Sequence, residues 1–108
     1  YKLADGSMAM FRPDANARTL WNFDVMHHFG GGEDHRFDLL PDLARLRCPT
    51  LVLGGEDDPI CTIDDQADIA AAIPQPLVRF ERFPRCGHGV YHDDPQRAFA
   101  VLREFLTS

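Results

Sequence analysis

Two acidic residues and a histidine follow two apolar stretches of this 108-residue chain. Asp57 and Asp58 come shortly after the apolar run Thr50–Leu53, and His88 comes shortly after Leu77–Phe83. Short apolar runs that stop at glycine or proline are typical of buried β-strands. Because neighbouring strands lie about 5 Å apart, an acid and a histidine far apart in sequence can meet at their ends.

An acid beside a histidine supports proton transfer. A carboxylate bonded to one imidazole nitrogen fixes the tautomer and stabilises the imidazolium. The other nitrogen can then take a proton from a hydroxyl or a thiol. An arbitrary pair of an aspartate and a histidine more often has a purely structural role than a catalytic one. Here Gly87 and Gly89 flank His88 and leave the backbone free to present the ring at a tight turn.

The segment between the two strand candidates predicts how they are arranged. Ile63–Ile73 is rich in alanine and carries apolar residues at helical spacing. Strand, helix and strand of this length form a βαβ unit, whose two strands are parallel. Parallel strands place their C-terminal ends at the same edge of the sheet, where ligand sites collect. The sequence therefore predicts the α/β class, with the acid and His88 at one edge.

Two motifs carry a resemblance to a known family. Cys48–Ile60 (CPTLVLGGEDDPI) followed by Phe83–Gly89 (FPRCGHG) resembles the last third of an α/β-hydrolase. Gly87–Pro95 (GHGVYHDDP) and the helix after it are most similar to the proline iminopeptidase-like, cap-bearing branch. The resemblance covers about residues 37–106 and implies the C-terminal portion of that fold: a βαβ unit plus a C-terminal helix, preceded by the end of a helical cap.

The family arranges a serine, an acid and a histidine in that chain order. The resemblance assigns the histidine to His88. It assigns the acid to Asp58, the third residue after the strand-ending Gly55, with Asp57 as the alternative if the turn is shifted by one. It also implies two parts of the chain, with 1–36 ending the cap or lid and 37–108 forming the C-terminal part of the core.

The family's nucleophile motif is missing from these residues. No Gly-x-Ser-x-Gly stretch occurs, Ser7 lacks the second glycine, and Ser108 is the last residue. We therefore expect the chain alone to be inactive and to need the N-terminal part of the same hydrolase, or another copy of the chain. The resemblance implies a serine-type hydrolase of amide, aminopeptidase-like or ester substrates, whether small molecules or peptides. The alternative is a non-catalytic fragment or truncated paralogue that acts as an interaction module.

Local patterns predict where four helices begin or end. Asp14 or Asn16 is a candidate cap for a helix that runs to about His28, where three glycines, residues 30–32, are expected to end it. Leucines at near-helical spacing predict a short amphipathic helix over 38–46. Thr62–Asp65 resembles a capping box, and Asp94-Pro95 predicts the start of the last helix.

Composition excludes several classes of partner. The net charge of −6 disfavours nucleic acid, because phosphate binding needs a basic face. No apolar run approaches the roughly 20 residues of a membrane span. The three cysteines have no disulfide or zinc spacing, so we expect free thiols and a cytoplasmic location.

The sequence predicts neither a metal nor another cofactor. His88 and His92 are four apart, but the flanking glycines oppose the helix that would aim both rings at one ion. Cys86 is better placed for packing than for nucleophilic attack, because it lies at a strand end.

Overall fold

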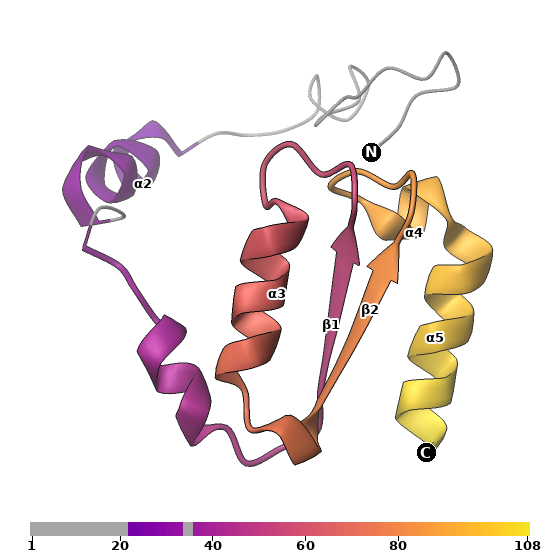
Figure 1. Cartoon of the computed structure of the whole chain (residues 1–108). Coiled ribbons are helices and arrows are strands. Elements are labelled where there is room, and N and C mark those ends of the chain that lie inside the picture. The colour runs from indigo at the N-terminus through magenta and orange to yellow at the C-terminus, as the bar shows by residue number, and fades with distance from the viewer. Residues whose placement is uncertain (1–21, 34–35) are drawn as a thin grey trace.

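The structure, a computed structural model, describes residues 22–33 and 36–108. Two strands form a central layer, with helix α3 (Ile63–Ala72) on one face and helix α5 (Pro95–Thr107) on the other (Figure 1). The short helix α4 (Val90–Asp93) lies at the end of the sheet to which both strands point. The α/β class predicted from the sequence is confirmed.

The strands β1 (Thr50–Gly55) and β2 (Val78–Phe83) are parallel, with Thr50 opposite Val78 and Gly55 opposite Phe83. The predicted βαβ unit is therefore present. Leu77 does not begin β2 as expected, because it belongs to a short 3₁₀ turn, η3 (Gln75–Leu77). The Leu77 N–H donates to the Pro74 carbonyl at 2.9 Å within that turn, and the strand starts one residue later.

Both predicted helix starts are confirmed around the sheet. The Thr62 hydroxyl accepts a hydrogen bond from the Asp65 N–H at 3.3 Å, and the Asp65 carboxylate accepts one from the Thr62 N–H at 3.2 Å. This reciprocal pair satisfies two N–H groups that the first turn of α3 would otherwise leave unbonded. Asp94 caps α5 by accepting from the Arg97 N–H at 3.1 Å.

The alternation of side chains along the strands divides the core into two clusters. Leu51 and Leu53 point to the α5 side and Val52 points to the α3 side. The α5-side cluster is built on Phe83, Cys86, Val90, Ala98 and Val101, and the α3-side cluster on Val52, Ala70 and Ile73. A strand that contributes apolar side chains to both faces is typical of a parallel sheet covered on both sides.

The two strands differ in their charge. β2 carries Arg79 and Glu81, whose side chains pair at 2.9 Å, and Arg79 also reaches Glu104 of α5 at 3.2 Å. Arg97 of α5 bonds Glu81 at 3.3 Å and stacks over the ring of Phe83. β1 has no charged residue, and within the described part of the chain its edge away from β2 has no strand beside it.

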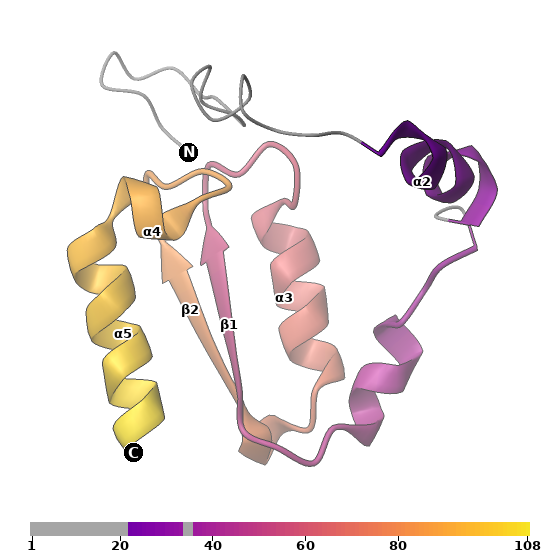
Figure 2. The same cartoon turned by 180° about the vertical axis from the view of Figure 1, so that it is seen from behind.

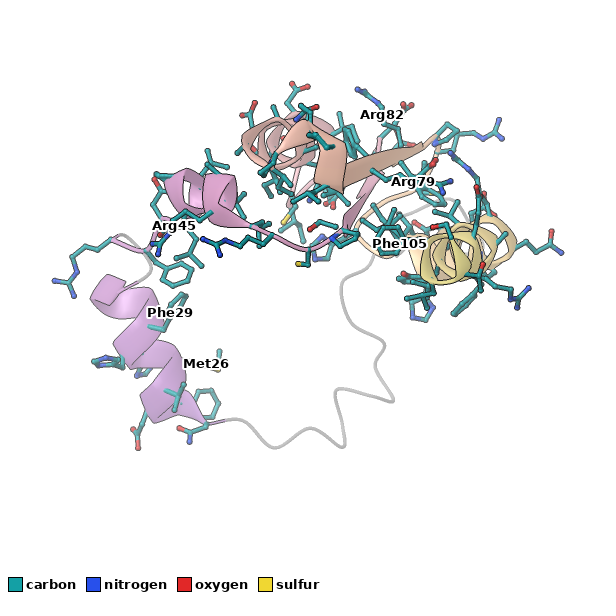
Figure 3. All side chains as sticks on the ribbon, turned by 90° about the horizontal axis from the view of Figure 1, so that it is seen from below. Met26, Phe29, Arg45, Arg79, Arg82 and Phe105 are labelled. Carbon is teal, nitrogen blue, oxygen red and sulfur yellow. The ribbon has the colours of Figure 1, made fainter. Side chains whose placement is uncertain are left out.

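The N-terminal helix differs from the expectation. α2 (Phe23–His28) begins at the cap residue Asn22, whose side chain accepts from the Val25 N–H at 3.1 Å. The expected caps Asp14 and Asn16 lie outside the described residues. Seen from below, Met26 and Phe29 lie on the opposite side of the molecule from Phe105 of α5, and α2 has no buried residue (Figure 3).

The glycine triplet does not end this helical segment, so that expectation is wrong. Residues 30–32 continue it as a π-helical turn, η1 (Phe29–Glu33). Glycine disfavours a helix by about 1 kcal/mol but, unlike proline, it keeps the N–H that helical bonding needs. A Cβ on any of the three would meet nothing within 4 Å, so packing does not require glycine there.

The amphipathic helix expected over 38–46 is shorter and is a 3₁₀ helix, η2 (Leu40–Arg45). Asp38 accepts from the Leu40 N–H at 3.0 Å, and Pro41 follows in the first turn. Leu43 lies in η2 and Leu46 directly follows it, and both pack on the α3-side cluster.

No helix in the residues that the structure describes is long and apolar enough to cross a membrane.

Candidate active site

Asp58 and His88 meet at the C-terminal edge of the sheet. Both loops leave the strands at the same end, beside α4 (Figure 2). The Asp58 Oδ2 atom lies 3.0 Å from the His88 Nδ1 atom. The two residues that the sequence pointed to are therefore within hydrogen-bonding distance, although thirty positions separate them.

The carboxylate of Asp58 is held by its own loop. Its Oδ1 atom accepts hydrogen bonds from the N–H groups of Ile60 at 2.8 Å and Cys61 at 3.1 Å. Burial of the side chain, which is 6% exposed, by itself raises the pKa of Asp58. The bonds from Ile60, His88 and Cys61 outweigh that effect and hold the pKa below its ordinary value of 3.8. Asp58 is therefore ionised at neutral pH.

Asp57, the alternative acid, takes another position. Its side chain is exposed, and its backbone N–H donates to the carbonyl of Cys86 at 2.9 Å. The geometry therefore pairs His88 with Asp58 rather than with Asp57.

The ring of His88 is half-exposed, with 43% of the side chain accessible. An ionised carboxylate can only accept a hydrogen bond, so Asp58 favours the tautomer with the proton on Nδ1. The lone pair of the neutral ring then lies on Nε2, the atom that can receive a proton from a partner group. This arrangement is suited to general base chemistry.

The loop that carries His88 sits directly on the end of β1. The Glu56 N–H donates to the Phe83 carbonyl at 3.0 Å. A Cβ built on Gly55 would lie within 2.5 Å of the carbonyl oxygens of both Cys86 and Gly87. The absence of a side chain at Gly55 thus allows the two loops to approach closely. Sequence reasoning used Gly55 only to count to Asp58 and missed this contact.

The spacing of His88 and His92 would present both rings to one metal ion only if the two residues shared a helix. His92 lies on α4, whereas His88 precedes the cap residue Gly89, so the two rings do not project from one helix. Within residues 22–33 and 36–108, no group of three metal-ligating side chains is gathered. His27 and His28 lie exposed at the end of α2.

All three cysteines fall within the described residues and none forms a disulfide. Cys86 is buried in the α5-side cluster, in agreement with a packing role.

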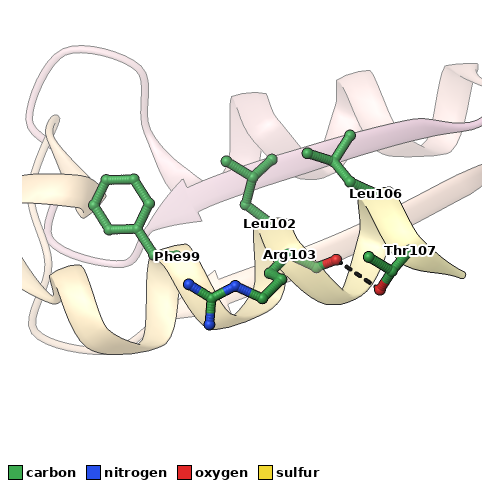
Figure 4. A pocket seen from close by; sticks show the side chains of 5 residues that line it. All are labelled: Phe99, Leu102, Arg103, Leu106 and Thr107. Carbon is green, nitrogen blue, oxygen red and sulfur yellow. Dashed lines mark hydrogen bonds between the residues drawn. The ribbon is translucent and has the colours of Figure 1, made fainter.

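An apolar hollow lies elsewhere, along α5. Leu102 and Leu106 stand on the same side of the helix and Phe99 extends the row (Figure 4). Arg103 and Thr107 complete the lining. The hollow contains neither Asp58 nor His88, so it is separate from the candidate active site.

Comparison with known proteins identifies the class. A model of the Alpha/beta hydrolase family matches residues 3–102, and the chain belongs to that family. The fold is accordingly the C-terminal portion of an α/β-hydrolase, as the sequence resemblance implied.

Two individual proteins illustrate the similarity. The AB hydrolase superfamily protein YisY of Bacillus subtilis (strain 168) is 28% identical over 71 residues, which are 66% of this chain and 26% of YisY. The structure of a thermophilic esterase from Thermogutta terrifontis, with malate bound, matches with a TM-score of 0.61 and 36% identity. That match covers 67% of this chain and 26% of the esterase. The chain thus aligns with about a quarter of each.

Proposed function

We propose that this chain supplies the acid and the histidine of a serine-type hydrolase. The observation that supports the proposal is the 3.0 Å contact between Asp58 Oδ2 and His88 Nδ1 at the C-terminal edge of the sheet. Asp58 is buried and ionised, and His88 is half-exposed. This is the combination that a base and its orienting acid need.

In the proposed reaction, a serine outside these residues attacks the carbonyl carbon of the substrate. His88 Nε2 takes the hydroxyl proton as the Oγ–C bond forms, and then gives that proton to the leaving group as the acyl-enzyme forms. Water then attacks the acyl carbon, and His88 takes a proton from it as the new O–C bond forms. The Oγ–C bond breaks, His88 returns the proton to the serine Oγ, and the acid product leaves. Asp58 stays ionised and stabilises the imidazolium that forms in each half.

We propose an ester as the substrate class, because the matched structure of 36% identity is that of an esterase. A second candidate is an amide or a peptide with a free N-terminus. It rests on Gly87–Pro95, which resembles the proline iminopeptidase-like branch. For either substrate we propose that residues 1–36 belong to the cap and 37–108 to the core.

We further propose that the missing nucleophile comes from the N-terminal part of the same hydrolase, with another copy of the chain as the alternative source. A cytoplasmic enzyme with free thiols fits the three cysteines. The rival interpretation is a non-catalytic interaction module.

A covalent probe separates the enzyme from the rival. A fluorophosphonate labels a serine only when a neighbouring base activates it. We expect the protein from its natural source to be labelled, and the His88→Ala variant, made in the same whole protein, to lose both labelling and ester hydrolysis. Unchanged labelling of His88→Ala, or no labelling of the wild-type protein, contradicts the proposed function.

A further inference from the structure

We propose that Asp93 is a positioning residue for His88 and acts through the backbone N–H of Gly87. The Asp93 Oδ2 atom accepts a hydrogen bond from that N–H at 2.6 Å. The inference deepens the proposed function, because it names the group that fixes the base of the same site.

Gly87 is buried, and its N–H therefore needs a partner. A buried N–H without an acceptor is strongly unfavourable, and a carboxylate is among the strongest acceptors available to it. The carboxylate comes from the far end of α4, six positions along the chain. Asp93 thus fixes the peptide group between Cys86 and Gly87, one residue before the peptide group that leads into His88.

Asp93 also holds the other side of His88. Its own backbone N–H donates to the carbonyl of Gly89 at 3.0 Å. One residue therefore bonds to the peptide groups of both glycines that flank His88, and these bonds close the backbone into a small loop around it. Because the flanking glycines are intrinsically free to rotate, such a closure is what gives the ring a single orientation.

Asp93 is the last residue of the four-residue helix α4, and its carboxylate reaches back to the Gly87 N–H. The neighbouring acid, Asp94, has an ordinary structural task, since it caps α5 by accepting from the Arg97 N–H. Two adjacent aspartates thus offer a matched comparison between positioning of His88 and capping of a helix.

The test uses the whole protein with ¹⁵N-labelled histidine and follows the Nδ1–H proton of His88 by NMR, assigned with His88→Gln. We expect Asp93→Ala to shift or broaden this resonance and to lower kcat by about 10–100-fold with little change in KM, as displacement of a base by about 1 Å does. Asp93→Asn keeps an acceptor oxygen at the same length and should restore both properties to near the wild-type values. Asp94→Ala should lower the melting temperature but leave the His88 resonance unchanged.

An unchanged His88 resonance in Asp93→Ala overturns the inference, and so does an equal change in Asp94→Ala. If Asp93→Ala does not fold, Asp93→Glu replaces it, and the longer acid should perturb the resonance more than Asp93→Asn does. The reverse order would contradict a bond of defined length to Gly87. The resonance reports the Asp58–His88 contact without turnover, so a protein that hydrolyses nothing yet shows these changes rejects the proposed function and keeps the positioning role.

Discussion

The loops after β1 and β2 reach the same edge of the sheet but are fixed in opposite ways. Asp58 is held from inside its own loop, by the N–H groups of the second and third residues after it. His88 is held from outside, by contacts of its loop with the end of β1 and by Asp93. The acid is buried and the histidine half-exposed.

This difference fits the roles proposed for the two groups. A carboxylate that orients a base works best ionised and immobile, and local N–H donors provide both conditions. A base must remain accessible on one nitrogen, so its ring cannot be enclosed and its backbone has to be fixed instead.

The largest effect is expected at the acid. Asp58→Asn should reduce ester hydrolysis by the whole protein by up to about 10⁴-fold, because the amide no longer favours the Nδ1–H tautomer or stabilises the imidazolium. Asp57→Asn, one residue away, is the matched control and should change turnover little. Steady-state kinetics of both variants measure these rates. A larger loss of turnover in Asp57→Asn would identify Asp57, and not Asp58, as the acid.

The next largest effect is expected at Gly55, against which the His88 loop packs. Gly55→Ala should destabilise the protein by an amount near the upper end of the roughly 1–3 kcal/mol range for overpacking, because the new Cβ meets backbone carbonyls that cannot turn away. Gly54→Ala points to the other face, where the nearest atom is the flexible end of Ile63 at 2.8 Å, and should cost less. Urea unfolding of the two variants measures their free energies of unfolding. Equal losses of stability would contradict the close contact described for Gly55.

A smaller effect should appear in acid. The pKa of Asp58 is lowered in the native protein, so the stability that this group contributes is fully present above its unfolded value near 3.8. It is lost as the pH falls further, through the native pKa. Urea unfolding between pH 5 and pH 2 should therefore show a steeper decline for the wild type than for Asp58→Asn. Parallel declines would mean that the carboxylate is not held as described.

The smallest effect distinguishes cysteines in the two loops. Thiol titration of the denatured, non-reduced protein should count three groups, since no disulfide is formed. In the native protein Cys86, which follows β2 and is 3% exposed, should react more slowly than Cys61, which follows β1 and is partly exposed. A count of one would reveal a disulfide, and faster reaction of Cys86 would show that its loop opens.

The local parts of this structure were predictable from the sequence. The Thr62–Asp65 capping box, the Asp94 cap and the βαβ order all depend on residues within a few positions of each other, or on simple periodicity. The two motifs around Asp58 and His88 also lie in short segments. They carried the resemblance that assigned His88 and that left Asp58 and Asp57 as alternatives for the acid.

The parts that were missed depend on contacts over longer separations or on competing weak preferences. Gly55 matters because it lies against Cys86 and Gly87, about thirty residues away, and no periodicity encodes that approach. The sequence does not indicate that Asp93 accepts a hydrogen bond from Gly87, because acids near a helix end are common. The glycine triplet and η2 were misjudged because segments this short can adopt α, 3₁₀ or π turns at similar free energy.

Because β1 and β2 differ in charge, we expect the sheet to extend at one of its edges and not at the other. β2 carries Arg79, Glu81 and Arg82, and charged side chains on an edge strand discourage pairing with a further strand. A strand that approached the open edge of β1 would meet Leu51, Val52 and Leu53 with no charge to displace. We therefore expect further strands, from the same hydrolase or from a second copy, to add beside β1, with β2 as the terminus at which the sheet stops.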